Sequence, residues 1–417
     1  MRIACVGGGP TGLYLAILAR LRSGGRDEVT VLERNEPGRT HGFGVTFGED
    51  LLDDLFRTDP EGAPALRAAS RLWCQQTVRI GEHRPVHLGG KYGYSMGRVR
   101  MLDLLARRAE ELGVQLRHGV TVGAREEIDA DVVVAADGAG SRLRTARAEH
   151  FGTAVEPGAN RYLWLGTDRC VDAFSFAFER TPAGWVWFYA YPSTDGAGTC
   201  IVECSPETWS GLGLDTLPAG DGLARLESVF ADALDGHRLL TPQGGLGEQP
   251  WLRFREVRNR TWRDGDLVLA GDAAHTTHFG IGSGTVLAVQ DAVALADALY
   301  GRIPGDPSGA DGIRAALAAY DARRRAVLGP VQDMARRNME WFERAGRRLD
   351  DGEDPVRFAW ALLDRRGDMG RMHYQLHRAT QVEPVRRVRR RLTSARRYRR
   401  ALSRGEITRA QLLTGAR

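Results

Sequence analysis

The chain opens on a short apolar run that breaks into three spaced glycines. The run, Ile3 to Val6, suits a strand buried on both faces, and it is followed by Gly7, Gly9 and Gly12. Between a strand and a helix, such glycines allow a tight bend, close approach of the backbone to a pyrophosphate, and close packing of the helix on the strand. The free N–H groups and the dipole at the start of that helix favour negative charge. This stretch predicts a dinucleotide site in an α/β fold.

The next strand supports the same interpretation. It covers Val29 to Leu32 and ends in Glu33, about twenty residues beyond the last glycine, where the dinucleotide fingerprint places an acidic residue. A carboxylate at this place accepts hydrogen bonds from a ribose. The alternative is a glycine-rich turn with a surface glutamate, because a chain with 51 glycines produces such spacings by chance.

Composition restricts the class of protein. A chain of 417 residues has room for two to three domains, and 42% hydrophobic with 27% charged residues is typical of soluble globular proteins. No apolar run reaches the roughly 18 residues that span a bilayer. Arg2 leads directly into the first strand, so we expect no signal peptide, no membrane contact and a cytoplasmic location. The five cysteines are odd in number and lack metal spacing, so we expect reduced packing residues and no metal site.

Two later motifs resemble each other in their position after a strand. Asp137-Gly138 follows a buried-type strand at 131–136, with Ser141 and Arg144 beyond it. Gly271-Asp272 follows an apolar strand at 267–270, and a glycine-rich turn (280–284) then leads into a helix. An aspartate at position 272 can accept a hydrogen bond from a ribityl hydroxyl, and the N–H groups after it can face the electron-rich edge of a flavin. A second glycine motif for a separately docked nicotinamide is missing, which favours a tightly held flavin that nicotinamide visits briefly.

Hydrophobic periodicity predicts the remaining elements. Helices are expected at 51–56, 65–72, 101–112, 223–234, 286–299 and 315–342. Strands are expected at 77–80, 85–88, 114–118, 161–165, 174–178, 185–191, 199–204 and 251–257. The stretch 38–48 is rich in glycine and is predicted to be a loop beside the cofactor.

Together these motifs resemble a family. Residues 7–12, Asp137-Gly138-x-x-Ser141-x-x-Arg144 and residues 271–275 match the three motifs of the single-component FAD-dependent aromatic hydroxylases, the group A flavin monooxygenases. Arg98 matches the family's arginine at the start of a helix, which reaches the flavin. The resemblance covers residues 1–342 and implies a Rossmann-like FAD-binding fold of the GR2 type, with an inserted β-sheet substrate domain and a helical C-terminal region. It divides the chain into FAD-binding parts at 1–75, 96–158 and 261–345, substrate-domain parts at 76–95 and 159–260, and an arginine-rich C-terminal part at 346–417.

The glycine-rich turn narrows the resemblance to a subgroup. The broad family usually has two prolines after the Gly-Asp motif and an asparagine beyond the glycines, where this chain has His278-Phe279 and Val286. Residues 278–285 look like those of the salicylyl-CoA and anthraniloyl-CoA hydroxylases, and the tryptophan-type hydroxylase of violacein biosynthesis shares them. Residues 160–167, 201–209 and 338–342 strengthen that match.

The resemblance implies a reaction. In the family, NADPH or NADH reduces FAD, O₂ adds to give a flavin C4a-hydroperoxide, and its terminal oxygen passes to an electron-rich aromatic ring. The subgroup implies an aromatic acyl-CoA substrate, with salicylyl-CoA 5-hydroxylation as the most concrete hypothesis. The alternatives are hydroxylation of an indole or another aromatic intermediate in secondary metabolism, a flavin halogenase with Lys91 as its relaying lysine, and an FAD protein without oxygen chemistry.

The motifs also assign site residues. The cofactor-binding set is Gly7, Gly9, Pro10, Thr11, Gly12, Glu33, Arg34, Arg98, Asp137, Asp272, Gly282, Ser283, Gly284 and Thr285. His278, with Phe279 beside it, is predicted to meet the hydroxyl or amine of the reacting ring, although His278 could equally support the loop. His275 is interpreted as structural. Tyr189 and Tyr191 share a face of their strand and are predicted to line the substrate pocket, with core packing as the alternative.

Arginines crowd the end of the chain, from Arg386 onwards. The cluster is either a solvated helix end or partly disordered tail, or a site for CoA phosphates, to which arginine's bidentate fork is suited; in the second case Arg389 and Arg390 bind substrate. Nucleic-acid binding is not supported, since no base-reading motif accompanies the arginines. A homodimer is compatible with the sequence, which leaves the oligomeric state open.

Overall fold

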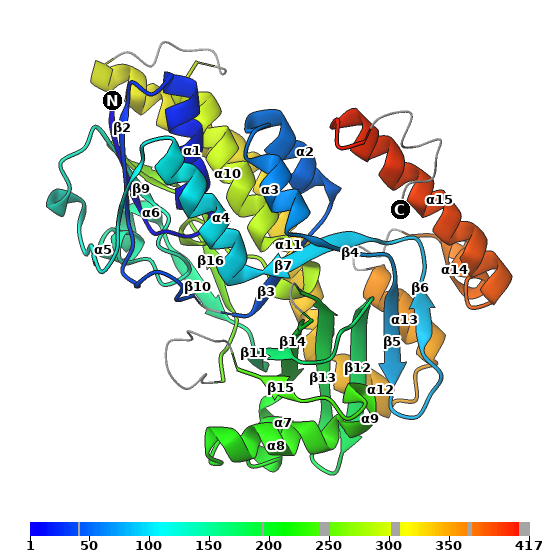
Figure 1. Ribbon diagram of the computed structural model, residues 1–417. Helices are drawn as coiled ribbons and strands as arrows, with labels where there is room; N and C mark the ends of the chain where they lie inside the picture. The colour runs from blue at the N-terminus through cyan, green and yellow to red at the C-terminus, as the bar shows by residue number, and fades with distance from the viewer. Residues whose placement is uncertain (41, 194–195, 242–250, 302–308, 365–368, 408–417) are drawn as a thin grey trace.

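The computed structural model of the chain describes residues 1–40, 42–193, 196–241, 251–301, 309–364 and 369–407. One half has the arrangement of a nucleotide-binding fold and the other half is built on a large sheet, with the helices of the C-terminal region along the right-hand side of the view (Figure 1). The predicted α/β fold with an inserted sheet and a helical C-terminal region is confirmed.

The first half is organised around a central, mostly parallel sheet. Its strand order is β17 (Arg263–Asp264), β18 (Leu267–Leu269), β9 (Val132–Ala135), β1 (Arg2–Val6), β2 (Glu28–Leu32) and β8 (Gln115–Arg117). Only β17 runs antiparallel to its neighbour. β1 and β9 are almost wholly buried, as expected for apolar strands covered on both faces. The chain adds β2 on one side of β1 and later adds β9 on the other side. The strand order therefore reverses at β1, and ligands bind at the carboxyl ends of strands at such a point.

Helices cover this sheet. α1 (Pro10–Ser23) joins β1 to β2 and packs against α4 (Arg98–Glu111) and α10 (Gly284–Leu299). Two short helices, α5 (Arg142–Ala146) and α6 (Ala148–Phe151), follow β9, and the 3₁₀ turn η1 (Arg125–Glu127) precedes it.

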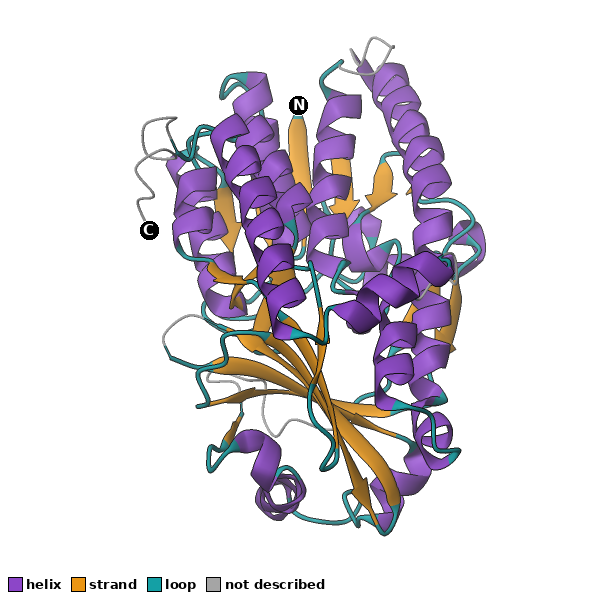
Figure 2. Cartoon of the chain, turned by 90° about the vertical axis from the view of Figure 1, so that its right-hand side faces the viewer, coloured by secondary structure: helices purple, strands orange, loops and turns teal. Residues whose placement is uncertain are grey.

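The second half is a large mixed sheet. Its strand order is β15 (Leu239–Leu240), β11 (Arg161–Thr167), β14 (Gly198–Cys204), β13 (Gly184–Pro192), β12 (Phe174–Thr181), β5 (Gln76–Ile80) and β6 (Val86–Leu88). β12 and β5 are parallel and the other pairs are antiparallel. The twist of this sheet is visible in Figure 2, where it lies below the helices of the first half.

Alternation of side chains gives the large sheet two different faces. One face, with Phe176, Phe178 and Tyr189, packs against the C-terminal end of α11 (Gly309–Glu343) and the helices after it. The other face, which includes Cys200 and Cys204, packs against α7 (Pro206–Gly211), α8 (Ala219–Val229) and α9 (Ala231–Leu234). All five cysteines are unbonded.

Two small sheets join the halves and correct two predictions. β3 (Gly44–Phe47), β7 (Gly93–Gly97) and β4 (Arg71–Trp73) form one of them, and β10 (Ala154–Pro157) pairs with β16 (Arg255–Arg258) in the other. The loop predicted at 38–48 was therefore wrong for 44–47, which pair with β7. The helix predicted to run to residue 72 ends earlier, as α3 (Ala63–Ala68), since the chain beyond Ser70 is recruited as a strand by the same partner.

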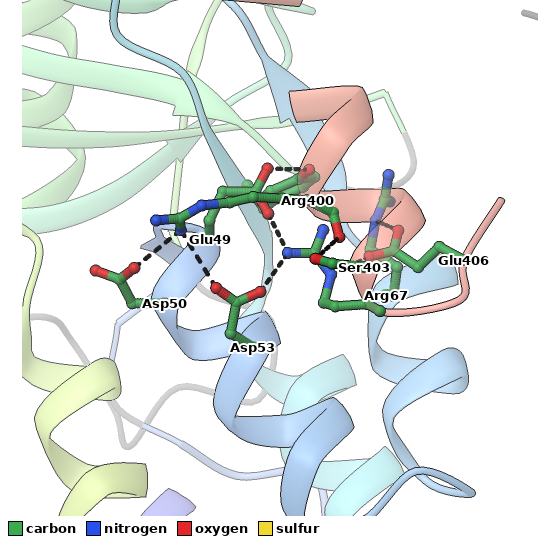
Figure 3. A network of polar contacts seen from close by, with 9 residues as sticks. Glu49, Asp50, Asp53, Arg67, Arg400, Ser403 and Glu406 are labelled. Atoms are coloured by element: carbon green, nitrogen blue, oxygen red, sulfur yellow. Dashed lines mark hydrogen bonds and ion pairs between the residues drawn. The ribbon is translucent and has the colours of Figure 1, made fainter. Parts of the chain in front are cut away.

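The remaining helices line one side of the molecule. They are α2 (Glu49–Thr58), α12 (Ala345–Asp350), α13 (Pro355–Leu363), α14 (Arg371–Ala379) and α15 (Glu383–Ser403). Ion pairs fasten the end of α15 to the body: Arg400 contacts Asp50 and Asp53 of α2, and Arg67 contacts Glu406 (Figure 3). In the part of the chain described above, no helix is both long and apolar enough to cross a membrane.

Candidate active site

A cavity of about 1370 Å³ lies between the central sheet and the large sheet. Ligand pockets usually measure roughly 300–1,000 Å³, so this cavity has room for more than one small molecule. Most of the predicted site residues line it: Gly7, Gly9, Pro10, Thr11, Glu33, Arg34, Arg98, Asp137, Tyr189, Tyr191, Asp272, Phe279, Gly282, Gly284 and Thr285. Gly12, His278, Ser283, Arg389 and Arg390 are not among the lining residues.

The glycine turn forms one end of the cavity. Gly7 has a φ of +113°, and a Cβ there would lie 2.2 Å from the carbonyl oxygen of Ala136. A Cβ on Gly12 would lie 2.1 Å from the carbonyl oxygen of Gly7, whereas one on Gly9 would meet nothing within 4 Å. Gly9 caps α1 without a side-chain hydrogen bond, so the first N–H groups of this helix remain available to a ligand.

Glu33 stands beside this turn at the end of β2. Its carboxylate accepts hydrogen bonds from the backbone N–H groups of Gly8, at 2.6 Å, and Asn35, at 2.8 Å. Both bonds hold the side chain at the cavity wall, where the fingerprint expects a ribose partner.

The Asp137 motif connects the turn after β9 with the Gly271-Asp272 turn. Asp137 Oδ2 accepts a hydrogen bond from the backbone N–H of Arg142, at 2.8 Å, while Oδ1 is buried without a partner among the described residues. Ser141 caps α5 by accepting from the N–H of Arg144. The Arg144 guanidinium then donates to the carbonyl oxygens of Ala139, at 2.6 Å, and Ala273, at 3.1 Å. This motif therefore holds the Gly271-Asp272 turn in place.

Asp272 and Arg98 face the middle of the cavity. The Asp272 side chain is exposed to the cavity although it lies inside the molecule, and desolvation raises its pKa while the charges of His275 and Arg98 oppose that shift. Arg98 is the first residue of α4, and its Nε donates to Thr40 Oγ1 at 3.0 Å. Burial lowers the pKa of Arg98 and Asp272 raises it. A cation and an acceptor thus line the same cavity and act on each other electrostatically.

A buried triad stabilises the turn behind Asp272. His275 Nε2 hydrogen-bonds Asp291 Oδ2 at 2.7 Å, and Arg324 Nε donates to Asp291 Oδ1 at 2.7 Å. Asp291 Oδ2 also accepts from the N–H of Gly271. Burial opposes the charge on Asp291, but His275 and Arg324 outweigh it and lower the pKa of Asp291. His275 lies outside the cavity lining, in agreement with a structural role.

The two residues predicted to be catalytic point in different directions. Phe279 lines the cavity, with its ring 4.6 Å from that of Tyr162 and 5.8 Å from that of Tyr189. His278 lies behind this wall, where its Nδ1 accepts from the N–H of Gly280 at 3.3 Å and its ring packs on Phe254 and Phe342. This position corresponds to the alternative in which His278 supports the loop.

One part of the cavity wall, to which the large sheet contributes, is mostly aromatic. The lining residues there are Tyr162, Trp164, Phe174, Tyr189, Tyr191, Ile201, Phe254 and Phe279. The Tyr191 hydroxyl donates to the carbonyl oxygen of Gly44 at 2.9 Å. This compartment suits a flat apolar ring.

Sequence reasoning missed several of these residues. Tyr162 and Trp164 alternate along β11 and therefore share a face, a signal that the strand pattern contained. It also missed Glu203, whose carboxyl group is buried behind the compartment and bonded to the Tyr189 hydroxyl. A single acidic residue in the otherwise apolar stretch of 200–204 was the available signal.

The predicted substrate-binding arginines lie apart from the cavity. Arg389 of α15 packs against the Gly89-Gly90 turn. Arg390 forms an ion pair with Glu383 of the same helix, at 3.2 Å. The structure therefore does not bring these two residues together with the other predicted site residues.

The cavity fits a dinucleotide such as FAD. The start of α1, which has no side-chain cap, suits a pyrophosphate. Asp137 Oδ1 has no hydrogen-bond partner among the described residues and is an unused polar atom in the wall. Asp272 presents an acceptor to the interior. The aromatic compartment beyond Asp272 leaves room for a second, flat ligand.

Known proteins are similar to this chain in sequence and in fold. Residues 119–335 match a protein family described as an FAD binding domain. Salicyloyl-CoA 5-hydroxylase of Streptomyces sp is 37% identical over 381 residues, which cover 89% of this chain and 71% of that protein. A 3-hydroxy-4-methyl-anthranilyl-[aryl-carrier protein] 5-monooxygenase of Streptosporangium sibiricum is 38% identical over 344 residues, 82% of this chain and 90% of the relative. The crystal structure of a mutant 2-methyl-3-hydroxypyridine-5-carboxylic acid oxygenase is similar in fold, with a TM-score of 0.63 and 18% identity over 80% of this chain and 90% of that one.

Proposed function

The chain belongs to the FAD-dependent aromatic monooxygenases, and from this membership we propose that its substrate is an aromatic acid carried as a thioester. FAD is the cofactor, and NAD(P)H and O₂ are the co-substrates of this class of enzyme. The observation that carries the proposal is the composite cavity, in which a dinucleotide cradle continues directly into an aromatic compartment.

The names of the two relatives support the proposed substrate class. One acts on a salicyloyl group on CoA and the other on a substituted anthranilyl group on a carrier protein, and both oxygenate position 5. In each ring, position 5 is para to the hydroxyl or amino group at position 2, which donates electrons to it. We propose the same pattern here: hydroxylation para to an electron-donating group on a 2-substituted benzoyl thioester.

The chain's own residues account for binding and orientation. In this proposal Gly7, Gly9 and the start of α1 hold the pyrophosphate of FAD, Glu33 the ribose, and Asp272 with Arg98 the flavin end. Bound FAD takes electrons from NAD(P)H and activates O₂, and the chain binds and orients the reactants and excludes water from them.

The substrate ring would lie in the aromatic compartment. Tyr189, Tyr191 and Phe279 are proposed to hold it with its para carbon towards the cofactor. The rings of the two tyrosines are buried and that of Phe279 is partly buried, so together they exclude water from the reacting atoms. Arg389 and Arg390 remain our proposal for the nucleotide phosphates of a CoA substrate, which would extend outside the cavity.

A substrate panel tests the function. Purified enzyme with FAD and NADPH is given 2-hydroxybenzoyl and 2-aminobenzoyl groups on CoA, on pantetheine and on an aryl-carrier protein, together with the free acids and indole. We expect a thioester to raise NADPH consumption and to yield a product with one added oxygen at position 5. The comparison of the CoA and carrier-protein arms identifies the carrier. Background rates with every thioester, together with turnover of a free acid or indole, would overturn the proposal.

A further inference from the structure

A carboxyl group is buried in the wall of the aromatic compartment. Glu203 lies on β14 and is 1% exposed. In the sheet it stands opposite Tyr162 on one side and Trp187 on the other. Tyr162, Tyr189 and Ile201 surround it on the same face, and all three line the cavity. Glu203 therefore lies directly behind the surface that the substrate ring would touch.

Neutral groups supply the hydrogen bonds of Glu203. Asn160 Nδ2 donates to Oε1 at 2.7 Å, and Trp187 Nε1 donates to Oε2 at 3.3 Å. The Tyr189 hydroxyl also donates to Oε2. No arginine, lysine or histidine among the described residues forms an ion pair with Glu203. Buried carboxylates are normally paired with a cation, because an unpaired buried charge is strongly disfavoured.

Two arginines act on neighbours of Glu203, Arg161 on Cys204 and Arg255 on Tyr162, but neither is among the charges that act on Glu203 itself. Glu343, at the end of α11, acts on Glu203 by repulsion, Cys204 is its neighbour on β14, and the tyrosines Tyr162 and Tyr189 come from β11 and β13. If Glu203 only filled the wall, a glutamine of the same size would accept hydrogen bonds from these donors without the cost of burying an ionisable group. Such unpaired buried acids next to a cavity are typical of functional sites.

We propose that Glu203 is a positioning residue for the hydroxylation, which acts through the Tyr189 hydroxyl to hold the ring hydroxyl or amine of the substrate and, where the group is a hydroxyl, to take up its proton. The inference rests on the proposed function, since it needs a ring with an ionisable substituent. In the transfer, the O–H bond of the substrate breaks and its proton passes to the Tyr189 oxygen, while the Tyr189 proton passes to a Glu203 oxygen. No electrons leave the ring, and one negative charge moves from Glu203 to the substrate oxygen, which makes the para carbon richer in electrons.

The protonation of Glu203 falls in a useful range. Burial and the charge of Glu343 raise the pKa of Glu203 to about 8, against the opposing hydrogen bonds of Asn160 and Trp187. The carboxyl group is thus neutral below that pH and is an available proton acceptor above it. General acid–base groups work best with a pKa close to the working pH.

Two variants and a matched control test the proposal. With a 2-hydroxybenzoyl thioester, the hydroxylation rate of the wild type is expected to rise as the pH passes about 8. Glu203→Gln and Tyr189→Phe should lower the rate by about a hundredfold and abolish that rise. Glu179→Gln is the control, because Glu179 is a half-buried glutamate of β12 near Arg79, on the opposite face of the sheet. It should keep the wild-type rate and pH profile.

A binding experiment does not depend on turnover. Without NADPH, the FAD-loaded wild type should bind 2-hydroxybenzoyl-CoA about tenfold more tightly than 2-methoxybenzoyl-CoA at pH 9, and Glu203→Gln should lose this preference. FAD content and melting temperature show whether each variant is folded. If thioesters are not bound, free 2-hydroxy- and 2-methoxybenzoate replace them, so failure of the thioester proposal is seen separately. A Glu203→Gln enzyme with the wild-type pH profile and preference would overturn the inference.

Discussion

Gly12 does not line the cavity, yet it determines where the cavity wall lies. It brings α1 so close to β1 that a Cβ would stand 2.1 Å from the Gly7 carbonyl oxygen, a backbone atom that has no room to move aside. Asp291 acts in a comparable way on the second turn, through Gly271, His275 and Arg324. At the scale of single residues, residues that do not line the cavity therefore hold the lining residues in position.

Gly12→Ala is therefore expected to weaken FAD binding strongly. The added methyl group must push α1 away from β1, at a cost of about 1–3 kcal/mol in overpacking, and the shift moves the start of α1 away from the pyrophosphate. FAD retained after purification and the FAD dissociation constant measure the effect, for which we expect at least a tenfold loss of affinity.

Gly220→Ala is the matched control for this change. Gly220 lies in α8, where a Cβ would meet nothing within 4 Å, so the substitution should leave FAD affinity unchanged. Equal FAD affinity of Gly12→Ala and wild type would contradict the assignment of the turn.

Among the elements, α15 is the one for which the sequence left open a solvated helix end, a partly disordered tail or a site for CoA phosphates. It is a helix from Glu383 to Ser403, held at its end by Arg404, which reaches Glu49 and Asp53 of α2. Its outer surface mixes apolar side chains, Val388 and Leu392, with arginines. A fixed helix presents its arginines at defined positions, which recognition of phosphate groups requires.

Replacing Arg389, Arg390 and Arg391 with alanine tests the phosphate proposal. If these arginines bind the nucleotide end of CoA, the KM for a 2-hydroxybenzoyl-CoA substrate should rise about tenfold, while that for the pantetheine thioester, which lacks the nucleotide, should not change. The control replaces Arg371 and Arg378, two exposed arginines of α14. An equal change for both thioesters would mean that the triple variant disturbs the packing of Arg389 on the Gly89-Gly90 turn instead.

For the whole molecule, the main feature is that the cavity is shared by both sheets. Residues of the first half, such as Asp137 and Asp272, and residues of the second, such as Tyr189, line the same space. A ligand that fills it contacts both halves and therefore stabilises them together. The free energy of unfolding must then depend on FAD concentration.

Addition of FAD to protein stripped of cofactor is expected to raise the melting temperature in proportion to the logarithm of FAD concentration. At a hundredfold excess over the dissociation constant, the gain in unfolding free energy is about 2.7 kcal/mol. Scanning calorimetry over a series of FAD concentrations measures this gain. A melting temperature that is insensitive to FAD would contradict the proposed cofactor site.

Much of the architecture followed from local rules in the sequence. The glycine turn, the acid after β2 and the strand-end aspartates are constraints on neighbouring backbone, so their spacing predicted a dinucleotide site in an α/β fold. The rest of the fold class followed from the family that these motifs resemble, and the family model and the relatives confirm that family. Period-two patterns likewise placed Tyr189 and Tyr191 on one face, and both line the cavity.

Other features depend on partners that lie far away in the chain. Residues 44–47 and 71–73 became strands because β7 was there to pair with them. His278 turns behind the wall because Phe254 and Phe342 offer it a packed site, and Glu203 lies behind Tyr189 because β14 pairs with β13. The sequence by itself determined the turns that cradle the cofactor, since backbone geometry is set by adjacent residues. Only the tertiary structure decided which side chains face the substrate, because that choice depends on the neighbours that long-range pairing brings together.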